Sequence, residues 1–416
     1  MTAEVAIMNT QGIALAADSA VTLTGSGKIY NSADKLFALS KYQPVGIMIY
    51  GSAGIMSVYW ETIIKSYRDF LGDKSFDKLS EYKEDFINYL AKFSYFTTKQ
   101  MLDYLESMCF DVFSHVLTWF IDDLHIEFDD KENIELSKID AVFNTSLKNI
   151  KERLKKEEDE KQIKLDGDFI DSNSETINKM LGVVFEKYQL SKKQTAELTS
   201  ILKLVLQKCY RIDDYTGVVI AGYGEREIFP CLCEFKVSGK LGDSLIYFDN
   251  DMAQIDTDPG HRAFIEPFSQ TEMVHQFAKG IDPDFYSAIL EKVDTILNSL
   301  APSMNDPEKE KAEAISKLLS EYMNSIIDAV YKDPILETVR GMQKNELVSM
   351  AEAMVNLTAL KRHVSDDAES VGGPIDVALI TKGDGFIWIK KKTNYDPNLN
   401  RGLNQNYFRG GRNENL

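Results

Sequence analysis

The first 54 residues consist of short apolar runs separated by turn residues. The runs are rich in β-branched and small residues and cover residues 5–8, 13–17, 36–39 and 45–50. This pattern predicts consecutive short β-strands, and the first two flank only residues 9–12, which predicts a β-hairpin. Because the first strand begins almost at residue one, we expect the start of the chain to be held in a buried sheet, unlike most chain termini.

Thr2 stands at the start of this predicted strand. Thr is small enough for Met1 to be removed in the cytosol, and removal would leave Thr2 with a free α-amine. A hydroxyl and an α-amine on one residue form a nucleophile with its own base. The pKa of an α-amine is about 7.7–8, so a part of it is neutral and able to accept a proton near pH 7. Many cytosolic proteins begin with Met-Thr, so position alone does not make Thr2 catalytic.

Three further residues predict a reactive site around Thr2. Asp18 ends the second run, where antiparallel pairing returns the chain to the start of the first strand. Lys35 opens the third run, and a cation beside a hydroxyl lowers the pKa of that hydroxyl and stabilises the alkoxide. Gly51 ends the fourth run, where a residue without Cβ lets a backbone N–H approach a carbonyl closely, as an oxyanion donor must.

This segment resembles the start of a proteasome β-type subunit, an N-terminal-nucleophile (Ntn) hydrolase whose catalytic Thr is exposed by processing. Matching outward from Thr2 places the family's acidic residue on Asp18, its lysine on Lys35 and its oxyanion-hole glycine on Gly51. The resemblance implies a bacterial proteasome-like protein that carries large helical insertions.

The match departs from the family in three places. The lysine position needs one extra residue in the turn at 25–27. The long self-cleaved propeptide of the family is absent, because only Met1 precedes Thr2. The second threonine common in the family is Ala3 here. The match therefore rests on residues with corresponding roles and not on an identical local sequence.

Composition agrees with a soluble cytoplasmic enzyme. A chain of 416 residues can bury a large core, and its hydrophobic content of 44% argues against disorder. The net charge of −18 argues against nucleic acid and anionic membranes as partners. No apolar run reaches transmembrane length and no signal peptide precedes Thr2, so we expect a cytoplasmic location. The four cysteines have neither zinc-type nor disulfide-framework spacing, so we expect no metal.

Helical periodicity follows the fourth strand and later takes over the chain. We expect helices over 54–65 and 79–98, which complete a first core segment at 1–98. A helical insertion follows over 99–212, with an exposed helix or hinge at the charged run 152–164.

Strands return after this insertion. Their hairpin patterns predict a second core segment over 213–280, followed by a second helical insertion over 281–342. A helix and a hairpin then complete the core over 343–393. The tail 394–416 is rich in Asn, Gly and Arg and is expected to be disordered.

Two later segments resemble the family's support for the amine of the catalytic Thr. Ser269 matches a serine near the start of a helix, with Thr271 as the rival. An equally weighted alternative makes Ser269 a plain helix N-cap, with Glu272 completing a capping box.

The second segment is an Asp-x-x-Ser pattern that precedes two glycines. Its family residues fall on Asp367 and Ser370, with Val371 as one extra residue before the glycines and Asp366 as an alternative register. A Gly-Gly turn before a strand is the structural alternative.

The resemblance implies an α+β fold, a four-layer αββα Ntn-hydrolase sandwich with two helical insertions. It implies a threonine-type endopeptidase that needs no cofactor. Thr2 would attack the carbonyl, Asp18 would position Lys35, and Gly51 would hold the oxyanion. Three residues would orient the amine, namely Ser269, Asp367 and Ser370.

The resemblance also implies an apolar specificity pocket, which favours an apolar side chain before the cut. Its lining positions are Val21, Ala33, Phe37, Ile49 and Ala53. The backbone of Thr22 and Ala53 would pair with an extended peptide as an added strand. Expected partners are a peptide or unfolded protein substrate and a possible homo-oligomer. Two alternatives remain: a small-molecule amidase of the same class, and a non-catalytic scaffold or assembly subunit that retains Met1.

Overall fold

The structure is a computed structural model with a mixed α/β fold built on two five-stranded sheets. It describes residues 2–22, 28–128, 135–156, 165–208, 214–256, 262–300, 306–365 and 371–393. The predicted tail 394–416 therefore lies outside the described residues. None of the helices in these ranges is both long and apolar enough to cross a membrane.

The first sheet contains the start of the chain in its interior. Its strands, in spatial order, are β12 (Ala263–Ser269), β1 (Ala3–Asn9), β2 (Gly12–Ala17), β13 (Asp376–Thr381) and β14 (Gly385–Lys390). All neighbouring strands are antiparallel, and β1 and β2 form the predicted hairpin. β1 pairs on both sides and both faces of its sheet are covered, so every one of its residues is buried, as the sequence predicted.

The second sheet follows the same antiparallel pattern. Its strands, in spatial order, are β11 (Ser244–Gln254), β10 (Cys231–Leu241), β9 (Thr216–Gly222), β6 (Val45–Gly51) and β5 (Leu36–Ala38). Two small ribbons accompany the sheets: β3 (Val21–Thr22) with β4 (Ile29–Tyr30), and β7 (Gly54–Ile55) with β8 (Val58–Tyr59).

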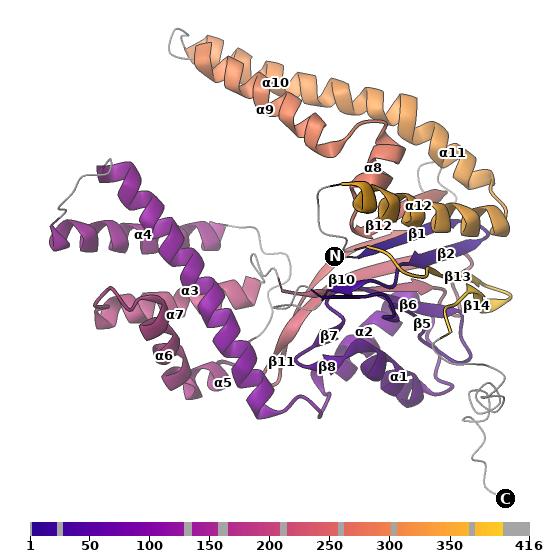
Figure 1. Cartoon of the computed structure of the whole chain (residues 1–416), viewed down its shortest axis with the longest axis horizontal. Coiled ribbons are helices and arrows are strands. Elements are labelled where there is room, and N and C mark those ends of the chain that lie inside the picture. The colour runs from indigo at the N-terminus through magenta and orange to yellow at the C-terminus, as the bar shows by residue number, and fades with distance from the viewer. Residues whose placement is uncertain are drawn as a thin grey trace, which may run out of the picture.

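Helices lie on the outer faces of both sheets (Figure 1). The second sheet packs against α1 (Trp60–Leu71) and α2 (Leu79–Ala91). The first packs against α8 (Glu272–Lys279), α11 (Asp333–Gly341) and α12 (Lys344–Val364).

Strand alternation separates three apolar layers. Met8 of β1 and Met48 of β6 belong to the layer between the two sheets. Their chain neighbours point the opposite way, so Ile7 packs against the helices on the first sheet and Ile47 against those on the second.

Two groups of helices extend from the sheets (Figure 1). The first comprises α3 (Thr98–Phe128), α4 (Leu136–Lys156), α5 (Gly167–Ser172), α6 (Ser174–Val184) and α7 (Lys192–Lys208). It has its own apolar cluster, to which Leu241 and Ile246 of the second sheet also contribute. The second comprises α9 (Pro283–Leu300), α10 (Asp306–Ile327) and the π-helical turn η3 (Asp328–Lys332), which leads into α11.

Two predicted helix boundaries are wrong. The helix expected over 54–65 begins only at Trp60, because the preceding residues form the β7–β8 ribbon. Met56 and Ser57 make its turn with positive φ angles of 48° and 64°, which a helix does not allow. The helix expected over 79–98 ends at Ala91, and the segment after it buries Phe93 in the core without helical structure.

Candidate functional site

Thr2 lies at the start of β1, between the two sheets. Its side chain is almost completely buried, with 1% exposure. The Thr2 carbonyl accepts a hydrogen bond from the Gln270 N–H at 3.1 Å. The Gly51 N–H, from the end of β6 in the other sheet, points to Thr2 Oγ1 at 3.5 Å. The structure therefore brings together the Thr and the Gly that the sequence singled out.

Asp18 is fixed beside Thr2 by the backbone. Its own N–H donates to the carbonyl of Ala3 at 3.1 Å, which continues the hairpin pairing. Its carboxylate accepts from the N–H groups of Ala3 at 3.1 Å, Ala20 at 3.2 Å and Gly372 at 2.9 Å. A carboxylate held by three backbone donors has a fixed orientation, so Asp18 can hold a cation in one place.

Lys35 is that cation. Its ammonium is paired with the Asp18 carboxylate, and the whole residue is only 3% exposed. The Lys35 carbonyl also accepts from the Ile49 N–H at 2.9 Å, so the residue is anchored to β6. A buried ion pair of this kind is costly unless it is well satisfied, and the donors on Asp18 satisfy it.

Glu4 is a site residue that the sequence analysis missed. It is 1% exposed, and its Oε1 lies 3.4 Å from Lys35 Nζ. Burial raises the pKa of Glu4 to about 8, and the negative charge of Asp18 also raises it. Lys35 and the Thr2 hydroxyl lower this pKa, although neither Glu4 oxygen has a hydrogen bond of ordinary geometry. One feature of the sequence could have identified Glu4. It is an acidic residue two positions after Thr2, so both lie on the same face of a strand that was predicted to be buried.

Gly51 has a conformation and surroundings that require glycine. Its φ angle is +83°, in the region that residues with a Cβ rarely adopt. A Cβ built there would lie 2.8 Å from the carbonyl oxygen of Tyr215, which leaves no room for a side chain. The N–H of Gly51 is thus presented toward Thr2 by backbone alone, as an oxyanion donor requires.

Ser269 does not cap a helix. It ends β12, pairs with Ala3 and has a φ angle of 63°, whereas α8 begins three residues later. The residue before α8 is Thr271, and its side chain makes no capping hydrogen bond. Glu272 binds Arg362 instead, at 3.0 Å, so the predicted capping box is wrong. Ser269 and Thr271 flank Gln270, the residue that donates to the Thr2 carbonyl.

The other two predicted amine-orienting residues, Asp367 and Ser370, lie outside the described residues, as does the alternative Asp366. The segment that follows them is described and reaches the site. Gly372 donates to Asp18, and its carbonyl accepts from the Ser19 N–H at 3.1 Å.

The predicted specificity residues have different surroundings. Phe37 and Ile49 are buried in the core between the second sheet and α1 and α2. Val21, Ala33 and Ala53 are partly buried. The Ala53 carbonyl accepts from the Trp60 N–H at 3.1 Å, and Thr22 pairs with Ile29 in the β3–β4 ribbon.

The described thiols are not suited to nucleophilic attack. Cys109, Cys231 and Cys233 are buried, and burial raises the pKa of Cys109 and of Cys233 to about 12. Such thiols remain protonated near neutral pH. Within the described ranges, no three His, Cys, Asp or Glu side chains are grouped so that they could hold a metal ion.

Comparison with known proteins gives only distant likenesses. No protein-family model and no curated protein matches the chain. Among solved structures, it is similar to Anbu (ancestral beta-subunit) from Yersinia bercovieri, with 9% identity and a TM-score of 0.29 over 98% of this chain and 97% of that one. It is also similar to the structure titled helical assembly of the Anbu complex from Pseudomonas aeruginosa, with 8% identity and a TM-score of 0.29 over 98% and 94%.

The assignment to the proteasome β-type subunits is wrong. No family model supports the assignment, and the two solved structures named above are Anbu proteins, a proteasome-like but distinct family.

Proposed function

We propose that the chain is a threonine-type peptidase of the Ntn class, with Thr2 as its nucleophile once the residue before it has been removed. The observation that carries this proposal is the Gly51 N–H, which points to the Thr2 hydroxyl from the opposite sheet. The buried Lys35–Asp18 pair beside it supports the same conclusion. A hydroxyl, an oxyanion donor and a fixed cation are the parts that acyl transfer needs.

In the proposed reaction, Thr2 Oγ1 attacks the carbonyl carbon of a peptide bond. The Thr2 amine, directly or through a water molecule, takes the hydroxyl proton and later gives it to the leaving amine. The Gly51 N–H stabilises the negative charge that develops on the carbonyl oxygen. Water then hydrolyses the acyl ester on Thr2, with the same amine as the base.

Lys35 stabilises the alkoxide in this scheme, and Asp18 holds Lys35 in place. Glu4 contributes by remaining uncharged near pH 7, as its raised pKa implies. A second full negative charge beside Lys35 would offset the positive charge of its ammonium and weaken its effect on Thr2. Ser269, Asp367 and Ser370 orient the amine as part of the same proposal.

The proposal also includes the layer architecture, the division into core and insertions, and the specificity positions. The layered sheets and helices would form the four-layer αββα sandwich, with core segments 1–98, 213–280 and 343–393 and helical insertions at 99–212 and 281–342. The apolar residues at the predicted specificity positions would favour an apolar side chain before the cut. A cytoplasmic homo-oligomer acting on peptides or unfolded proteins is the proposed context.

Hydrolysis of short fluorogenic peptides tests the proposal. Wild-type protein should release the fluorophore, Thr2→Ala should not, and Thr2→Ser should retain part of the activity. Thr10→Ala is a matched control, since Thr10 is exposed in the turn at the other end of β1. Equal hydrolysis by wild type and Thr2→Ala would refute the assignment of the nucleophile, and hydrolysis of simple amides but not peptides would favour the amidase alternative.

A further inference from the structure

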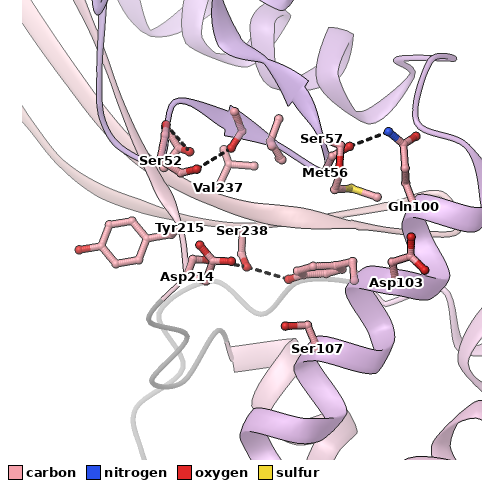
Figure 2. A pocket seen from close by; sticks show the side chains of 14 residues that line it. Ser52, Met56, Ser57, Gln100, Asp103, Ser107, Asp214, Tyr215, Val237 and Ser238 are labelled. Atoms are coloured by element: carbon pink, nitrogen blue, oxygen red, sulfur yellow. Dashed lines mark hydrogen bonds between the residues drawn. The ribbon is translucent and has the colours of Figure 1, made fainter. Parts of the chain in front are cut away.

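A polar cavity opens next to Gly51, where the core meets the first helical group. Its volume is about 280 Å³, and Ser52 and Gly54 line it immediately after Gly51 in the chain. Figure 2 shows the segment around Ser52 and Met56 on one side and α3 on the other. The cavity was not part of the specificity pocket that the sequence predicted, which was apolar.

One face of α3 supplies a wall of this cavity. Gln100, Asp103, Tyr104 and Ser107 all line it, and their spacing of three and four residues places them on the same side of the helix. Figure 2 shows three of them, Gln100, Asp103 and Ser107, on this helix. The cavity therefore exists only because the helical insertion packs against the core.

Hydrogen bonds hold this wall in place. The Gln100 side chain donates to the Met56 carbonyl at 2.7 Å. The Tyr104 hydroxyl donates to Ser238 Oγ at 2.8 Å, and the Ser238 hydroxyl donates to the Asp214 carbonyl at 2.8 Å. Figure 2 draws the hydrogen bond between Gln100 and Met56 as a dashed line. The cavity is thus a built feature of the fold, tied to the core at two points.

The lining of the cavity is negatively charged. The carboxylates of Asp103 and Asp214 line it with the hydroxyls of four serines, and no lysine or arginine is among the lining residues that the structure describes. The nearby ammonium of Lys236 lies over the Tyr215 ring instead, 4.8 Å from its centroid. Such a lining attracts a cationic group that can also form hydrogen bonds with the hydroxyls. It would repel an acidic side chain.

The cavity is connected directly to the proposed oxyanion donor. Gly51 pairs with Thr216 between β6 and β9, and the Thr216 hydroxyl donates to the Ser52 carbonyl at 3.2 Å. Thr216 also lines the cavity. An extended peptide advances about 3.3 Å per residue, so a peptide whose carbonyl lies at Thr2 and Gly51 reaches the cavity within about three residues.

We propose that this cavity is a subsite for a lysine or arginine side chain of the peptide substrate, close to the bond that is cut. The proposal rests on the proposed peptidase function, and it adds a second specificity determinant that the helical insertion provides. Asp103 and Asp214 bind the charged group of the substrate's lysine or arginine. The serine hydroxyls accept hydrogen bonds from its N–H groups, and Tyr104 packs beside its aliphatic part.

Matched peptides that carry lysine or its neutral isostere norleucine at successive positions near the cut test this subsite. At one position, kcat/KM should be higher for lysine. Asp103→Asn and Asp214→Asn should each reduce that lysine-to-norleucine ratio about threefold, as expected for ion pairs with exposed carboxylates. Asp122→Asn, an exposed site on α3 away from the cavity, should leave the ratio unchanged. If no position favours lysine, or if both cavity variants keep the wild-type ratio, the subsite is wrong while the peptidase stands.

Binding to the Thr2→Ala protein separates the subsite from catalysis. Fluorescence anisotropy with labelled lysine and norleucine peptides should show tighter binding of the lysine peptide. Raised salt should weaken this preference, and Asp103→Asn should reduce it about threefold. If the lysine peptide binds more tightly in this way but the wild type hydrolyses neither peptide, the proposed peptidase function is wrong and the binding subsite is supported. Equal binding of the two peptides overturns the subsite, whatever the hydrolysis assay gives.

Discussion

Lys35 Nζ lies 3.4 Å from Glu4 Oε1, although both side chains are almost entirely buried. Lys35 is also paired with Asp18, so one buried ammonium lies between two acids. Only Asp18 has backbone donors that stabilise its negative charge. The two acids therefore have different roles, with Asp18 as the charged partner of Lys35 and Glu4 as its largely protonated neighbour near neutral pH.

The raised pKa of Glu4 predicts a pH-dependent stability. The ordinary pKa of 4.5 applies to the unfolded chain and about 8 to the folded one, so between these values the folded state binds more protons. Stability therefore falls as pH rises from 4.5 to 8, by an amount on the order of a few kcal/mol. Glu4→Gln, which cannot ionise, should flatten this part of the profile. Urea unfolding at pH 5, 6.5 and 8 measures it, and parallel profiles for the two proteins would show that Glu4 does not titrate in this range.

Lys35→Ala should abolish peptide hydrolysis, because it removes the cation beside Thr2. It should also lower the free energy of unfolding by about 3 kcal/mol, since it leaves the buried Asp18 without its partner. The chain should still fold, because Asp18 keeps its backbone donors. Circular dichroism and turnover are measured on the same sample, and a folded variant with near-normal turnover would contradict the assigned role.

Gly51→Ala should reduce kcat by about 100-fold, the effect of losing one oxyanion donor. The added Cβ conflicts with the Tyr215 carbonyl, so the strand end must shift and the N–H with it. Gly72→Ala is the control, because Gly72 also has a positive φ of 58° but no atom within 4 Å of its added Cβ. That variant should lose only about 1–2 kcal/mol of stability from backbone strain and retain its kcat. Equal effects of the two changes on kcat would mean that strain, not the oxyanion donor, explains the loss.

The sequence predicted those parts of the fold that depend on local patterns. The apolar runs at 5–8 and 13–17 and the short turn between them predicted the β1–β2 hairpin, which brings Asp18 to Ala3. Lys35 and Gly51 could be placed because each borders a strand whose limits the apolar runs define.

The errors arise where packing or backbone conformation overrides the pattern. Ile55 and Val58 fit a helical spacing, but the left-handed Met56 and Ser57 turn them into partners across a ribbon. The burial of the Glu4 carboxyl could not be predicted, because it depends on how the two sheets pack and on β12, which comes much later in the chain. The cavity beside Gly51 could not be predicted, because it depends on where α3 docks.

Intact mass of the protein after treatment with a peptide epoxyketone tests the central claim most directly, because this reagent needs both a hydroxyl and a free α-amine on one residue. The native protein should lack Met1 and gain the mass of one inhibitor, and peptide mapping should locate the adduct on Thr2. Thr2→Ala should gain no mass, whereas Thr10→Ala should react as the wild type does. Hydrolytically active protein that retains Met1, or that carries the adduct on another residue, would contradict the account.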